Sequence, residues 1–474
     1  MGLCTLYHRC YGLHTSERKG DRWETELTDL IFAADMADGY ALVNRRLLSD
    51  GVIRRSNRGD TKFLPDILLV TKSPEPVLSR FAPNTPSQLE NLDSTWVILG
   101  DDGGETYSDR IRSLIDQTTI GIELLKKYPY TRRFSYSIAR PWDVEGDMPP
   151  ALMEVYLQGI EGALHITGFA RSIDTCNYLN LNLLWLSKLQ KGIADRTGLK
   201  CGSIALMIVN AHYYLRDEDI IKKIMDVEEI PPTEDAKLIR AKTIPIGWRE
   251  TLELVYHEGY EDETQWGEVF ERQGRAKFGH RVLLEIESPL EEMIDDMAPF
   301  TKSYGEEYAA RYVIGFPEVK IEDGEVYTYA SRARGDPDDE RWFERERVDQ
   351  LAAVVSRLKE DKWTRRAFVT ISRPWDIMLD EPACLRSYVF QAIDDETLGL
   401  TLFMRSNDAY GATHANQYGF ARLLWWVARE TGFKKCRMTL LSCNMHIYGD
   451  SWDAVGNLLR PEMPTTRERL GICD

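Results

Sequence analysis

A long internal repeat constrains the fold of this chain more than any other feature of its sequence. The first copy contains these polar and aromatic groups, in order: Thr131-Arg132-Arg133, Arg140-Pro141-Trp142-Asp143, Arg171-Ser172-Ile173-Asp174, Asn182 and His212-Tyr213-Tyr214. The second copy contains matching groups in the same order: Thr364-Arg365-Arg366, Arg373-Pro374-Trp375-Asp376, Arg405-Ser406-Asn407-Asp408, Asn416 and His446-Ile447-Tyr448. The offset is nearly constant, since 374 − 141 = 233 and 446 − 212 = 234. Such a long period with matched polar residues indicates a duplicated domain and not a solenoid.

The two copies differ at one position that matters for chemistry. The second copy has Pro382-Ala383-Cys384 where the first has Pro149-Pro150-Ala151. Only the second copy therefore carries a thiol in this place. The asymmetry predicts one working site, in the second copy, and one degenerate site, in the first.

The length of the chain suits two domains of ordinary size. We expect a first domain in residues 1–235 and a second, catalytic domain in residues 236–474. The stretch 228–242 reads as the linker between them, because it is rich in proline and charged residues. The repeated pattern of the second copy begins near Trp248.

The composition excludes several classes of function. A net charge of −17 argues against a nucleic-acid polymer as partner, because such a surface needs a basic stripe. The densest apolar run, Leu423 to Ala428, is far too short to cross a membrane. The cysteines show no metal-ligand spacing, so we expect no metal site and a cytoplasmic protein with reduced thiols. The arginines gather in the repeated motifs, which favours a small phosphorylated ligand.

Periodicity predicts an α+β fold for each copy. Strands are expected in three pairs of matching segments: 134–139 and 368–372, 155–170 and 388–404, 203–209 and 438–442. The segments 155–170 and 388–404 are each broken by a polar turn, so each reads as an antiparallel pair. Helices are expected at 178–197 and 418–431, and the glycine that follows each one is a C-terminal stop.

Cys384 is the candidate nucleophile. Most free cysteines are buried structural thiols, and this reading is the alternative for Cys384. Three features favour a reactive thiol: the Pro-Ala turn before it, the Arg405-Ser406 pair that returns after one strand hairpin, and the loss of the thiol at Ala151. A neighbouring guanidinium favours the thiolate, which is the form that attacks.

The repeated arginines are candidate phosphate ligands. A single Thr-Arg-Arg segment is more often a solvated turn. Two of them at the same place in a repeat, at Arg132-Arg133 and Arg365-Arg366, suggest a fork for phosphate, because paired guanidiniums match its geometry. Arg405 and Ser406 would add two more donors to the phosphate.

Asn416, His446 and Tyr448 are candidates for recognising a base and a sugar. The Asn416 amide offers a donor and an acceptor that can read the edge of a uracil, whereas its alternative role is the N-cap of the following helix. His446 and Tyr448 alternate along one strand and so face the same side, where both could bond a sugar hydroxyl. A lone histidine on a strand is more often a satisfied core group, but this one recurs at His212 with Tyr214.

The ordered set of motifs resembles the thymidylate synthase family, in particular its short archaeal-type branch. The resemblance covers about Trp248 to Tyr448 in the second copy and, more loosely, Leu68 to Tyr214 in the first. Its most specific stretches are Met404 to Tyr410 and His446 to Gly449. The resemblance implies two tandem domains, each a mixed sheet covered by helices, docked as a pseudo-two-fold dimer within one chain.

The resemblance also implies a reaction. The thiolate of Cys384 would add to carbon-6 of the uracil of dUMP, and carbon-5 would take a one-carbon unit from 5,10-methylenetetrahydrofolate to give dTMP. In this scheme the site residues have these roles: Arg405 beside the thiol and on phosphate, Ser406 on phosphate, Asn416 on the base, Asp408 on the base or folate, His446 and Tyr448 on ribose, and Tyr329 in removal of the carbon-5 proton.

Sites in this family are shared between two subunits, and here they would be shared between two halves. Arg132 and Arg133 of the first half would complete the Cys384 site. The degenerate site would contain Ala151, Arg171, Ser172, Asn182, His212, Tyr214, Arg365 and Arg366. That site is expected to be inactive, whether it still binds a nucleotide or only supplies arginines. The expected partners are thus a nucleotide and a folate, with a monomeric pseudo-dimer or a half-swapped dimer as the assembly.

Some residues depart from the family's pattern and leave alternatives open. Leu385 follows the cysteine where many members have histidine, and the loop from Tyr410 to Ala415 lacks the usual folate-contacting run. The chain end, Gly471 to Asp474, lacks the usual small apolar tail. A site open to water yields a hydroxymethyl product, so a pyrimidine nucleotide hydroxymethylase is one alternative. A non-catalytic nucleotide-binding protein is the other. Two residues are candidates for the glutamate that organises water: Glu253 and Glu258.

Overall fold

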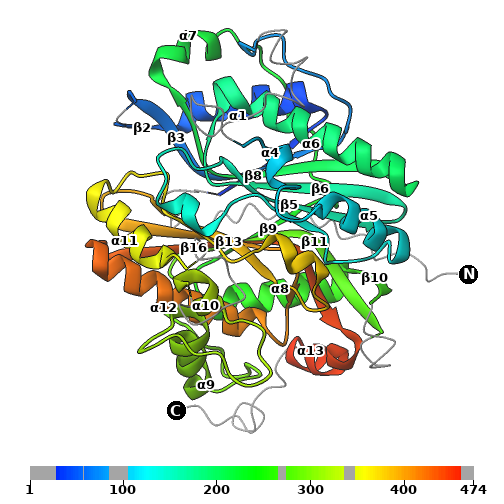
Figure 1. The fold of residues 1–474 in the computed structure, drawn as a ribbon, viewed down its shortest axis with the longest axis vertical. Helices are drawn as coiled ribbons and strands as arrows, with labels where there is room; N and C mark the ends of the chain where they lie inside the picture. Colours follow the sequence, from blue (N-terminus) through cyan, green and yellow to red (C-terminus); the bar gives the residue numbers. More distant parts are fainter. Residues whose placement is uncertain (1–27, 57, 85–104, 265–273, 336–346, 461–474) are drawn as a thin grey trace, which may run out of the picture.

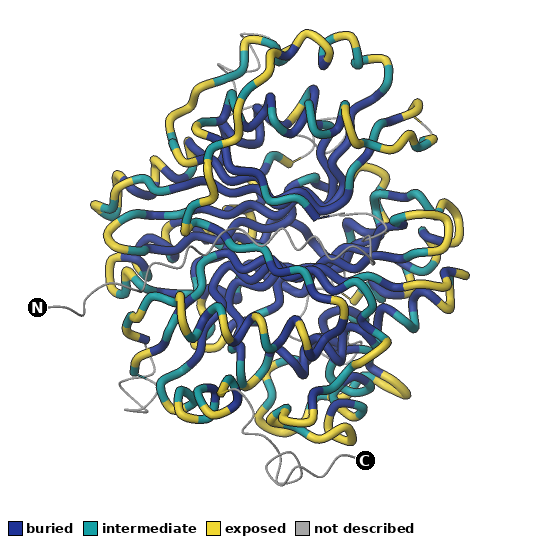
Figure 2. Tube along the Cα trace, turned by 180° about the vertical axis from the view of Figure 1, so that it is seen from behind, coloured by how far each residue is buried: buried dark blue, intermediate teal, exposed yellow. Residues whose placement is uncertain are grey.

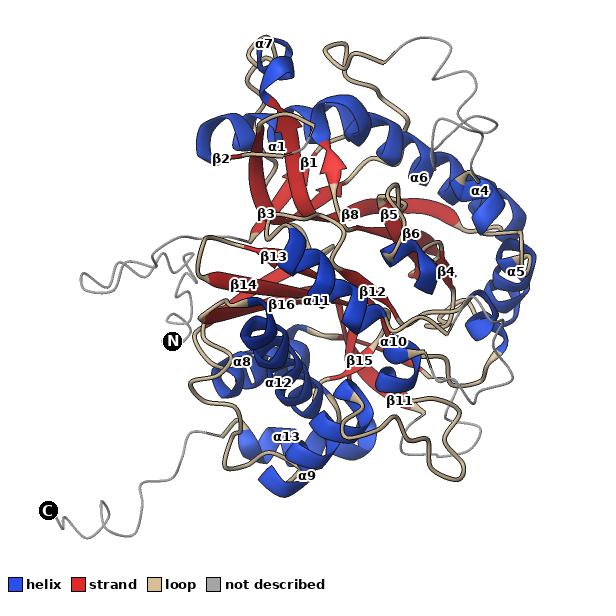
Figure 3. Cartoon of the chain, turned by 60° about the vertical axis from the view of Figure 1, so that its left-hand side comes forward, coloured by secondary structure: helices blue, strands red, loops and turns tan. Residues whose placement is uncertain are grey.

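The computed structural model describes residues 28–56, 58–84, 105–264, 274–335 and 347–460, and the chain end discussed above lies outside them. Within these residues each copy forms one eight-stranded mixed sheet. The two sheets pack against each other in the middle of the molecule, and the long helices cover their outer faces (Figures 1 and 3). The expected α+β fold with two tandem domains is confirmed.

The first sheet comes from the first copy. Its strands lie in the order β1 (Asp29–Ala33), β3 (Thr61–Thr71), β8 (Lys200–Tyr214), β6 (Ala163–Ala170), β5 (Leu152–Ile160) and β4 (Ser135–Ser137), with β2 (Val52–Arg54) on β3 and β7 (Ile173–Asp174) on β8. Its helices are α1 (Met36–Asp50), α4 (Tyr107–Arg110), α5 (Gln117–Lys127), α6 (Thr175–Thr197) and α7 (Glu218–Ile221). The pair β5 and β6 is antiparallel, whereas β6 and β8 are parallel.

The second sheet repeats this arrangement. Its strands lie in the order β10 (Tyr260–Glu263), β11 (Arg275–Ile286), β16 (Lys435–Tyr448), β14 (Thr397–Met404), β13 (Leu385–Ala392) and β12 (Phe368–Thr370), with β9 (Lys237–Ala241) on β11 and β15 (Asn407–Asp408) on β16. Its helices are α8 (Ile244–Glu258), α9 (Lys302–Glu307), a π-helix (Tyr308–Ile314), α10 (Tyr329–Arg334), α11 (Gln350–Glu360), α12 (Thr413–Thr431) and α13 (Trp452–Leu458). No helix in the described part of the chain has the length and apolar character needed to cross a bilayer.

Most predicted elements are present, and they differ mainly at their ends. Helices α6 and α12 stop at Gly198 and Gly432, whose φ angles of 77° and 86° are the left-handed values that glycine permits. Helix α6 begins earlier than its apolar pattern, because the Asp174 side chain accepts a bond from the Asn177 amide and caps it. The linker prediction is wrong for Lys237–Ala241, which forms β9 and pairs in parallel with β11.

The two sheets share one core. Phe169 of β6 and Phe403 of β14, which are equivalent residues of the two copies, stack with ring centroids 4.8 Å apart and planes 14° from parallel. This contact marks the pseudo-two-fold axis. Apolar side chains from both sheets surround it, and Figure 2 shows the buried layer that runs through the centre of the molecule. Burial of these apolar faces stabilises the docked arrangement of the halves.

Two buried charged residues cross between the sheets. Asp66 on β3 and Arg281 on β11 occupy matching positions of the two copies, both with positive φ angles, of 48° and 47°. Asp66 accepts hydrogen bonds from Thr401 at 2.7 Å and Thr439 at 2.9 Å, both in the second sheet. Arg281 donates to Thr167 and Ser203 of the first sheet, both at 2.8 Å. In a symmetric dimer of identical chains, the same residue would occupy both of these positions. The two halves of this chain differ in sequence, so one position holds an acidic residue and the other a basic residue.

The buried carboxyl of Asp66 is expected to make stability fall as pH rises. Burial raises the pKa of Asp66 from 3.8 to about 7, although the bonds from Thr401 and Thr439 oppose the shift. The folded protein then keeps a proton that the unfolded chain has released between about pH 4 and pH 7. The free energy of unfolding therefore falls across this window, by at most about 1.4 kcal/mol per unit of pKa difference. An Asp66→Asn variant has no such proton to lose.

Urea denaturation at about pH 5 and about pH 8 measures this effect. The stability of Asp66→Asn relative to wild type should rise between the two values. Asp226→Asn, at a carboxylate whose side chain is 83% exposed, is the surface control. A relative stability of Asp66→Asn that is the same at both pH values would contradict the prediction.

Candidate active site

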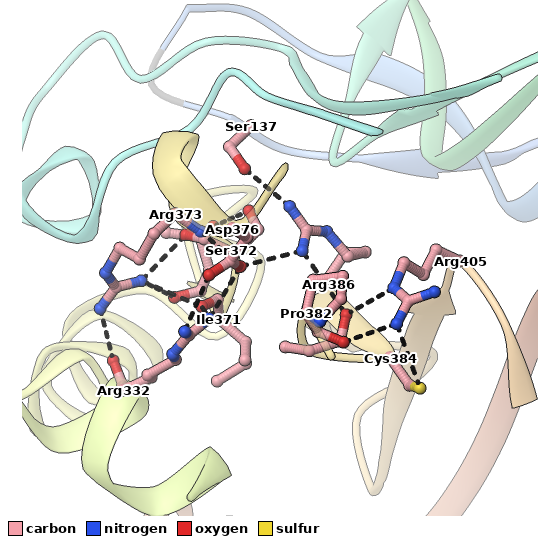
Figure 4. Close-up of polar contacts among 12 residues, drawn as sticks. Ser137, Arg332, Ile371, Ser372, Arg373, Asp376, Pro382, Cys384, Arg386 and Arg405 are labelled. Carbon is pink, nitrogen blue, oxygen red and sulfur yellow. Dashed lines mark hydrogen bonds and ion pairs between the residues drawn. The ribbon is translucent and has the colours of Figure 1, made fainter. Parts of the chain in front are cut away.

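Cys384 opens into a cavity of about 590 Å³ that both halves line. The cysteine directly precedes β13, and the β13–β14 hairpin brings Arg405 back beside it, as the sequence predicted. The Arg405 amide donates to the Cys384 carbonyl at 2.9 Å, and its guanidinium nitrogen Nη2 lies 3.7 Å from the sulfur (Figure 4).

The Arg405 guanidinium also holds backbone in place. It donates to the carbonyls of Ala383 at 3.1 Å, Pro382 at 2.6 Å and, in the other half, Arg132 at 2.8 Å. The Arg405 side chain is buried. Through these bonds it fixes both the turn before the cysteine and the loop that carries Arg132. Because the guanidinium is positively charged, all three hydrogen bonds are charge-assisted and stronger than bonds between neutral groups.

A buried ion network supports the cysteine segment from behind. The Asp376 carboxylate accepts two bonds from Arg332, both at 2.8 Å, and one from Arg386 at 2.9 Å (Figure 4). Arg386 also donates to Ser137 of the first half at 2.8 Å and lies 3.7 Å from the Glu154 carboxylate, again of the first half. The repeated motifs included Asp376 but not Arg386 or Glu154, because the other copy has Met153 and Ser387 at these places.

Arg132 and Arg133 reach the Cys384 cavity from the first half. Arg132 donates to the Tyr448 hydroxyl at 3.0 Å, and its other terminal nitrogen lies 3.5 Å from Ser406 Oγ. Arg133 donates to the carbonyl of Leu379 at 3.3 Å and pairs with Asp380 at 3.2 Å. The chain itself thus brings together arginines and a cysteine that lie more than 200 residues apart in sequence.

His446 and Tyr448 lie on β16 and face the cavity together, as predicted. Their rings meet edge to face with centroids 4.7 Å apart, and His446 Nδ1 lies 3.4 Å from Ser406 Oγ. Burial, and then the charge of Arg132, hold the pKa of His446 well below its usual range. The imidazole is therefore neutral at physiological pH and can offer one donor and one acceptor.

Asn416 also lines the cavity, in the first turns of α12, and it is not the N-cap of that helix. Its Oδ1 accepts a bond from the Tyr308 hydroxyl at 2.6 Å, and its Nδ2 donates to Asn407 Oδ1 at 3.3 Å. The ring of Tyr308 lies between those of Tyr304 and Tyr312, with centroid distances of 6.1 Å and 5.1 Å. The motif analysis missed this tyrosine wall, although spacing of four residues along one helix would have indicated it.

Tyr329 and Asp408 both lie at the edge of the cavity, as expected. Burial raises the pKa of Tyr329 well above its usual range, so its hydroxyl keeps its proton. Burial also raises the pKa of Asp408. Asp408 Oδ1 accepts bonds from the amides of Tyr410 at 3.1 Å and Gly411 at 3.0 Å, so this carboxylate shapes the loop before α12.

Neither glutamate proposed for organising water lies at the Cys384 cavity. Glu253 is exposed on α8, and Glu258 pairs with Lys237 at 3.1 Å. Both lie elsewhere because α8 covers the outer face of the sheet. Glu325 is a lining carboxylate that the sequence reasoning missed, and Arg311 holds it through two bonds of 2.8 Å and 3.0 Å.

A family model described as thymidylate synthase matches residues 90–251 and 306–472. The chain belongs to the thymidylate synthase family. The putative thymidylate synthase of Methanosarcina mazei is 32% identical over 228 residues, which are 48% of this chain and 96% of that protein. The one of Methanococcoides burtonii is 31% identical over 234 residues, 48% of this chain and 98% of its own length. The thymidylate synthase of Streptococcus suis is 28% identical over 130 residues, 26% of this chain and 46% of that protein.

These proportions fit a tandem arrangement. Nearly the whole length of an archaeal relative corresponds to about half of this chain. This thymidylate synthase family member therefore contains in one chain what two copies of such a relative would supply. The duplication read from the motifs and the two matching sheets agree with this proportion.

The first half of this family member has a cavity of its own, of about 880 Å³. Six of the residues expected at the degenerate site line it: Arg171, Ser172, His212, Tyr214, Arg365 and Arg366. The other two do not. Ala151 lies outside the lining, and Asn182 is buried within α6, where its Nδ2 bonds the Tyr178 carbonyl at 2.9 Å.

One group of side chains in the described residues has the composition of a metal site. The ligand atoms of His165, Asp235 and His280 lie within 4.8 Å of one another, between the two halves. The buried guanidinium of Arg281 lies 4.0 Å from the Asp235 carboxylate and bonds Ser203 beside it. A metal cation next to a fixed guanidinium is electrostatically disfavoured, so we assign no metal ion to this group.

Proposed function

We propose that this protein transfers a one-carbon unit from 5,10-methylenetetrahydrofolate to carbon-5 of dUMP, with Cys384 as the covalent nucleophile. Membership of the thymidylate synthase family supports a methyltransferase role of this general kind. The observation that carries the specific proposal is the position of the thiol. Its sulfur lies 3.7 Å from the Arg405 guanidinium, in a cavity that Arg132 and Arg133 complete from the other half.

In this proposal the cavity divides into a phosphate end and a base end. Arg132, Arg133 and Ser406 bind the phosphate, and Arg405 contacts it while it holds the thiol. His446 and Tyr448 bond the ribose from β16. Asn416 reads the uracil edge, and its present bond from Tyr308 must rearrange or be shared when the base enters. These groups hold carbon-6 of the base over the sulfur, and such positioning lowers the barrier to attack.

The other residues handle protons and water. Tyr329 keeps its hydroxyl proton and can bond the acceptor that takes the proton from carbon-5. Methylenetetrahydrofolate, when bound, supplies the methylene carbon and the hydride that reduces it. The tyrosine wall of Tyr304, Tyr308 and Tyr312 offers flat faces on which a pterin ring can stack.

Closure of the cavity decides between a methyl and a hydroxymethyl product. Asp380 is almost fully exposed at its rim, with a side-chain exposure of 99%, and Glu381 is exposed beside it. If water enters before the hydride is delivered, it traps the methylene intermediate as a hydroxymethyl group. The hydroxymethylase is therefore the second candidate on the same scaffold.

Incubation with dUMP and methylenetetrahydrofolate tests the proposal. We expect a methylated nucleotide by mass spectrometry, together with one dihydrofolate formed per turnover by absorbance. A hydroxymethyl product without dihydrofolate would assign the alternative. Absence of both products, and of a covalent adduct with 5-fluoro-dUMP, would overturn both and favour a non-catalytic nucleotide-binding protein.

Arg132→Ala is expected to raise the Michaelis constant for dUMP about 10- to 100-fold, with a smaller effect on kcat. The change removes a charged donor to phosphate, and such a bond contributes about 1.5–3 kcal/mol. Arg132 accepts from Arg405 through its backbone carbonyl, which alanine retains. Steady-state kinetics measures the effect.

Arg357→Ala is the matched control for this variant. Arg357 also crosses between the halves, donating to the Glu145 carbonyl at 2.6 Å, but it does not line the Cys384 cavity. Its Michaelis constant for dUMP should stay within about twofold of wild type. Equal constants for Arg132→Ala and wild type would refute the shared site.

A further inference from the structure

The cavity of the first half keeps the phosphate end of the site but has lost its base end. At the phosphate end the contacts repeat those around Cys384. Arg365 donates to the Tyr214 hydroxyl at 3.2 Å, as Arg132 does to Tyr448 at 3.0 Å. Arg171 donates to the Arg365 carbonyl at 2.7 Å, as Arg405 does to Arg132. The arginine at the phosphate end and the contacts that hold it are thus repeated in the first half.

An aromatic pair, Tyr107 and Trp185, lies on the side that corresponds to the base end of the Cys384 cavity, outside the lining of the first-half cavity. Gly419 on α12 leaves room for the tyrosine wall, because a Cβ atom there would come within 2.8 Å of Val313 and 3.1 Å of Tyr308. The equivalent residue of α6 is Trp185, which is buried and packs edge-on against Tyr107 at 5.3 Å.

Tyr107 is also turned away from the cavity. It is the counterpart of Tyr329, and its hydroxyl accepts a bond from the Leu152 amide at 3.0 Å. Leu152 follows Ala151, so the tyrosine bonds the backbone next to the position where the second half has its thiol. Asn182, which would read the base, is bonded to its own helix. Among the described residues, Tyr107 and Asn182, the counterparts of Tyr329 and Asn416, therefore do not line this cavity.

The mouth of this cavity carries an arginine where the second half has an aspartate. Arg216 replaces Asp450, and its guanidinium lies 4.2 Å from the centre of the Tyr214 ring. It donates to the carbonyl of Arg58, whose side chain also lines the cavity. Four aspartates line the cavity as well, and one of them, Asp147, pairs with Arg366 at 2.8 Å. Burial, and then the charge of Arg365, lower the pKa of Arg171 to about 9, as expected for a cation crowded by others.

We propose that the first half is a second binding site, for a phosphate monoester that has no pyrimidine ring. The guanidiniums of Arg365, Arg366 and Arg216 hold the phosphate, with Ser172 as a further donor. Trp185 and Tyr107 are buried against each other outside the lining of this cavity, and they occupy the space where the other site reads the base. This role goes beyond one-carbon transfer and beyond the supply of Arg132 and Arg133. Its ligand class covers sugar phosphates and related small monoesters.

Binding stoichiometry tests the proposal, with ribose 5-phosphate and dUMP as probes on the full chain. Calorimetry is expected to find one dUMP site per chain but two sites for ribose 5-phosphate. Arg365→Ala should weaken one ribose 5-phosphate site at least tenfold and leave dUMP binding in place. Arg132→Ala, its symmetric counterpart, should weaken dUMP and the other ribose 5-phosphate site.

Three results would overturn the proposal. Two equivalent dUMP sites would show that the base end is open. A single ribose 5-phosphate site that only Arg132→Ala affects would show that the first half does not bind the ester. Unchanged ribose 5-phosphate binding in both Arg365→Ala and Arg216→Ala would exclude these arginines as phosphate ligands. Absence of dUMP binding would count against the proposed reaction alone, because the ribose 5-phosphate readout at Arg365 does not depend on it.

Discussion

Cys384→Ser should lower kcat for the dUMP reaction by about 10⁴-fold or more, with little change in dUMP affinity. A serine hydroxyl stays protonated beside Arg405, so the enzyme loses the anion that attacks carbon-6. Removal of a nucleophile costs on the order of 10⁴- to 10⁶-fold in enzymes that form a covalent intermediate. Arg405 and the phosphate ligands remain, so binding of dUMP by calorimetry should persist. Turnover and the mass of the 5-fluoro-dUMP adduct measure the two consequences.

Cys201→Ser is the matched control for this experiment. Cys201 is a half-buried free thiol on β8 of the first half, and it lines neither cavity. Its variant should keep wild-type turnover and form the adduct. Cys384→Ser that keeps more than about one per cent of activity, or an adduct mapped to another cysteine, would reject Cys384 as the nucleophile.

Asp376→Asn should destabilise the second half by about 3–5 kcal/mol, the cost of removing one partner from a buried ion network. Burial alone would raise the pKa of Asp376, but Arg332 and Arg386 outweigh it and hold the pKa below its usual value. Asparagine would leave both guanidiniums buried without their shared anion, and its amide group would face them as a donor. Because the network supports the turn before Cys384, turnover should fall as well.

Asp143→Asn tests the same motif in the first half. Asp143 accepts two bonds from the Arg110 guanidinium, at 2.6 Å and 3.0 Å, and Met153 stands where the second half has Arg386. Its variant should therefore lose less stability than Asp376→Asn. Urea unfolding monitored by circular dichroism gives both values. A greater loss of stability in Asp143→Asn than in Asp376→Asn would mean that the Arg386 guanidinium does not determine the destabilisation.

The candidate site was predictable wherever the two copies carry the same residues. Arg132, Ser406, His446 and their counterparts recur at a constant offset, and the geometry places them together around the cavity. Prediction failed for residues outside the repeated motifs. Glu253 and Glu258 are the predicted candidates for the glutamate that organises water, and α8 places both away from the cavity. Tyr308, which bonds Asn416, has no counterpart that the repeat could reveal.

Fold prediction was limited in a different way. Strand pairs and helix ends follow from local patterns, such as the turn at Glu161-Gly162 and the stop at Gly198. Strand β9 was missed because its charged residues, Lys237 and Arg240, lie in a segment rich in proline and acid. Pairing with β11 stabilises the strand conformation of this segment, which its local sequence does not predict.

The sequence by itself determined that the chain is a duplication, which copy has the thiol, and which arginines recur. These are properties of residue identity at matched positions. Only the tertiary structure decided how the copies have diverged. Asp66 against Thr401, Arg386 against Glu154, and Trp185 in the place of Gly419 depend on contacts between segments far apart in the chain. Close packing sets which side chain can occupy such a contact, and a linear comparison of the two copies shows only that their residues differ.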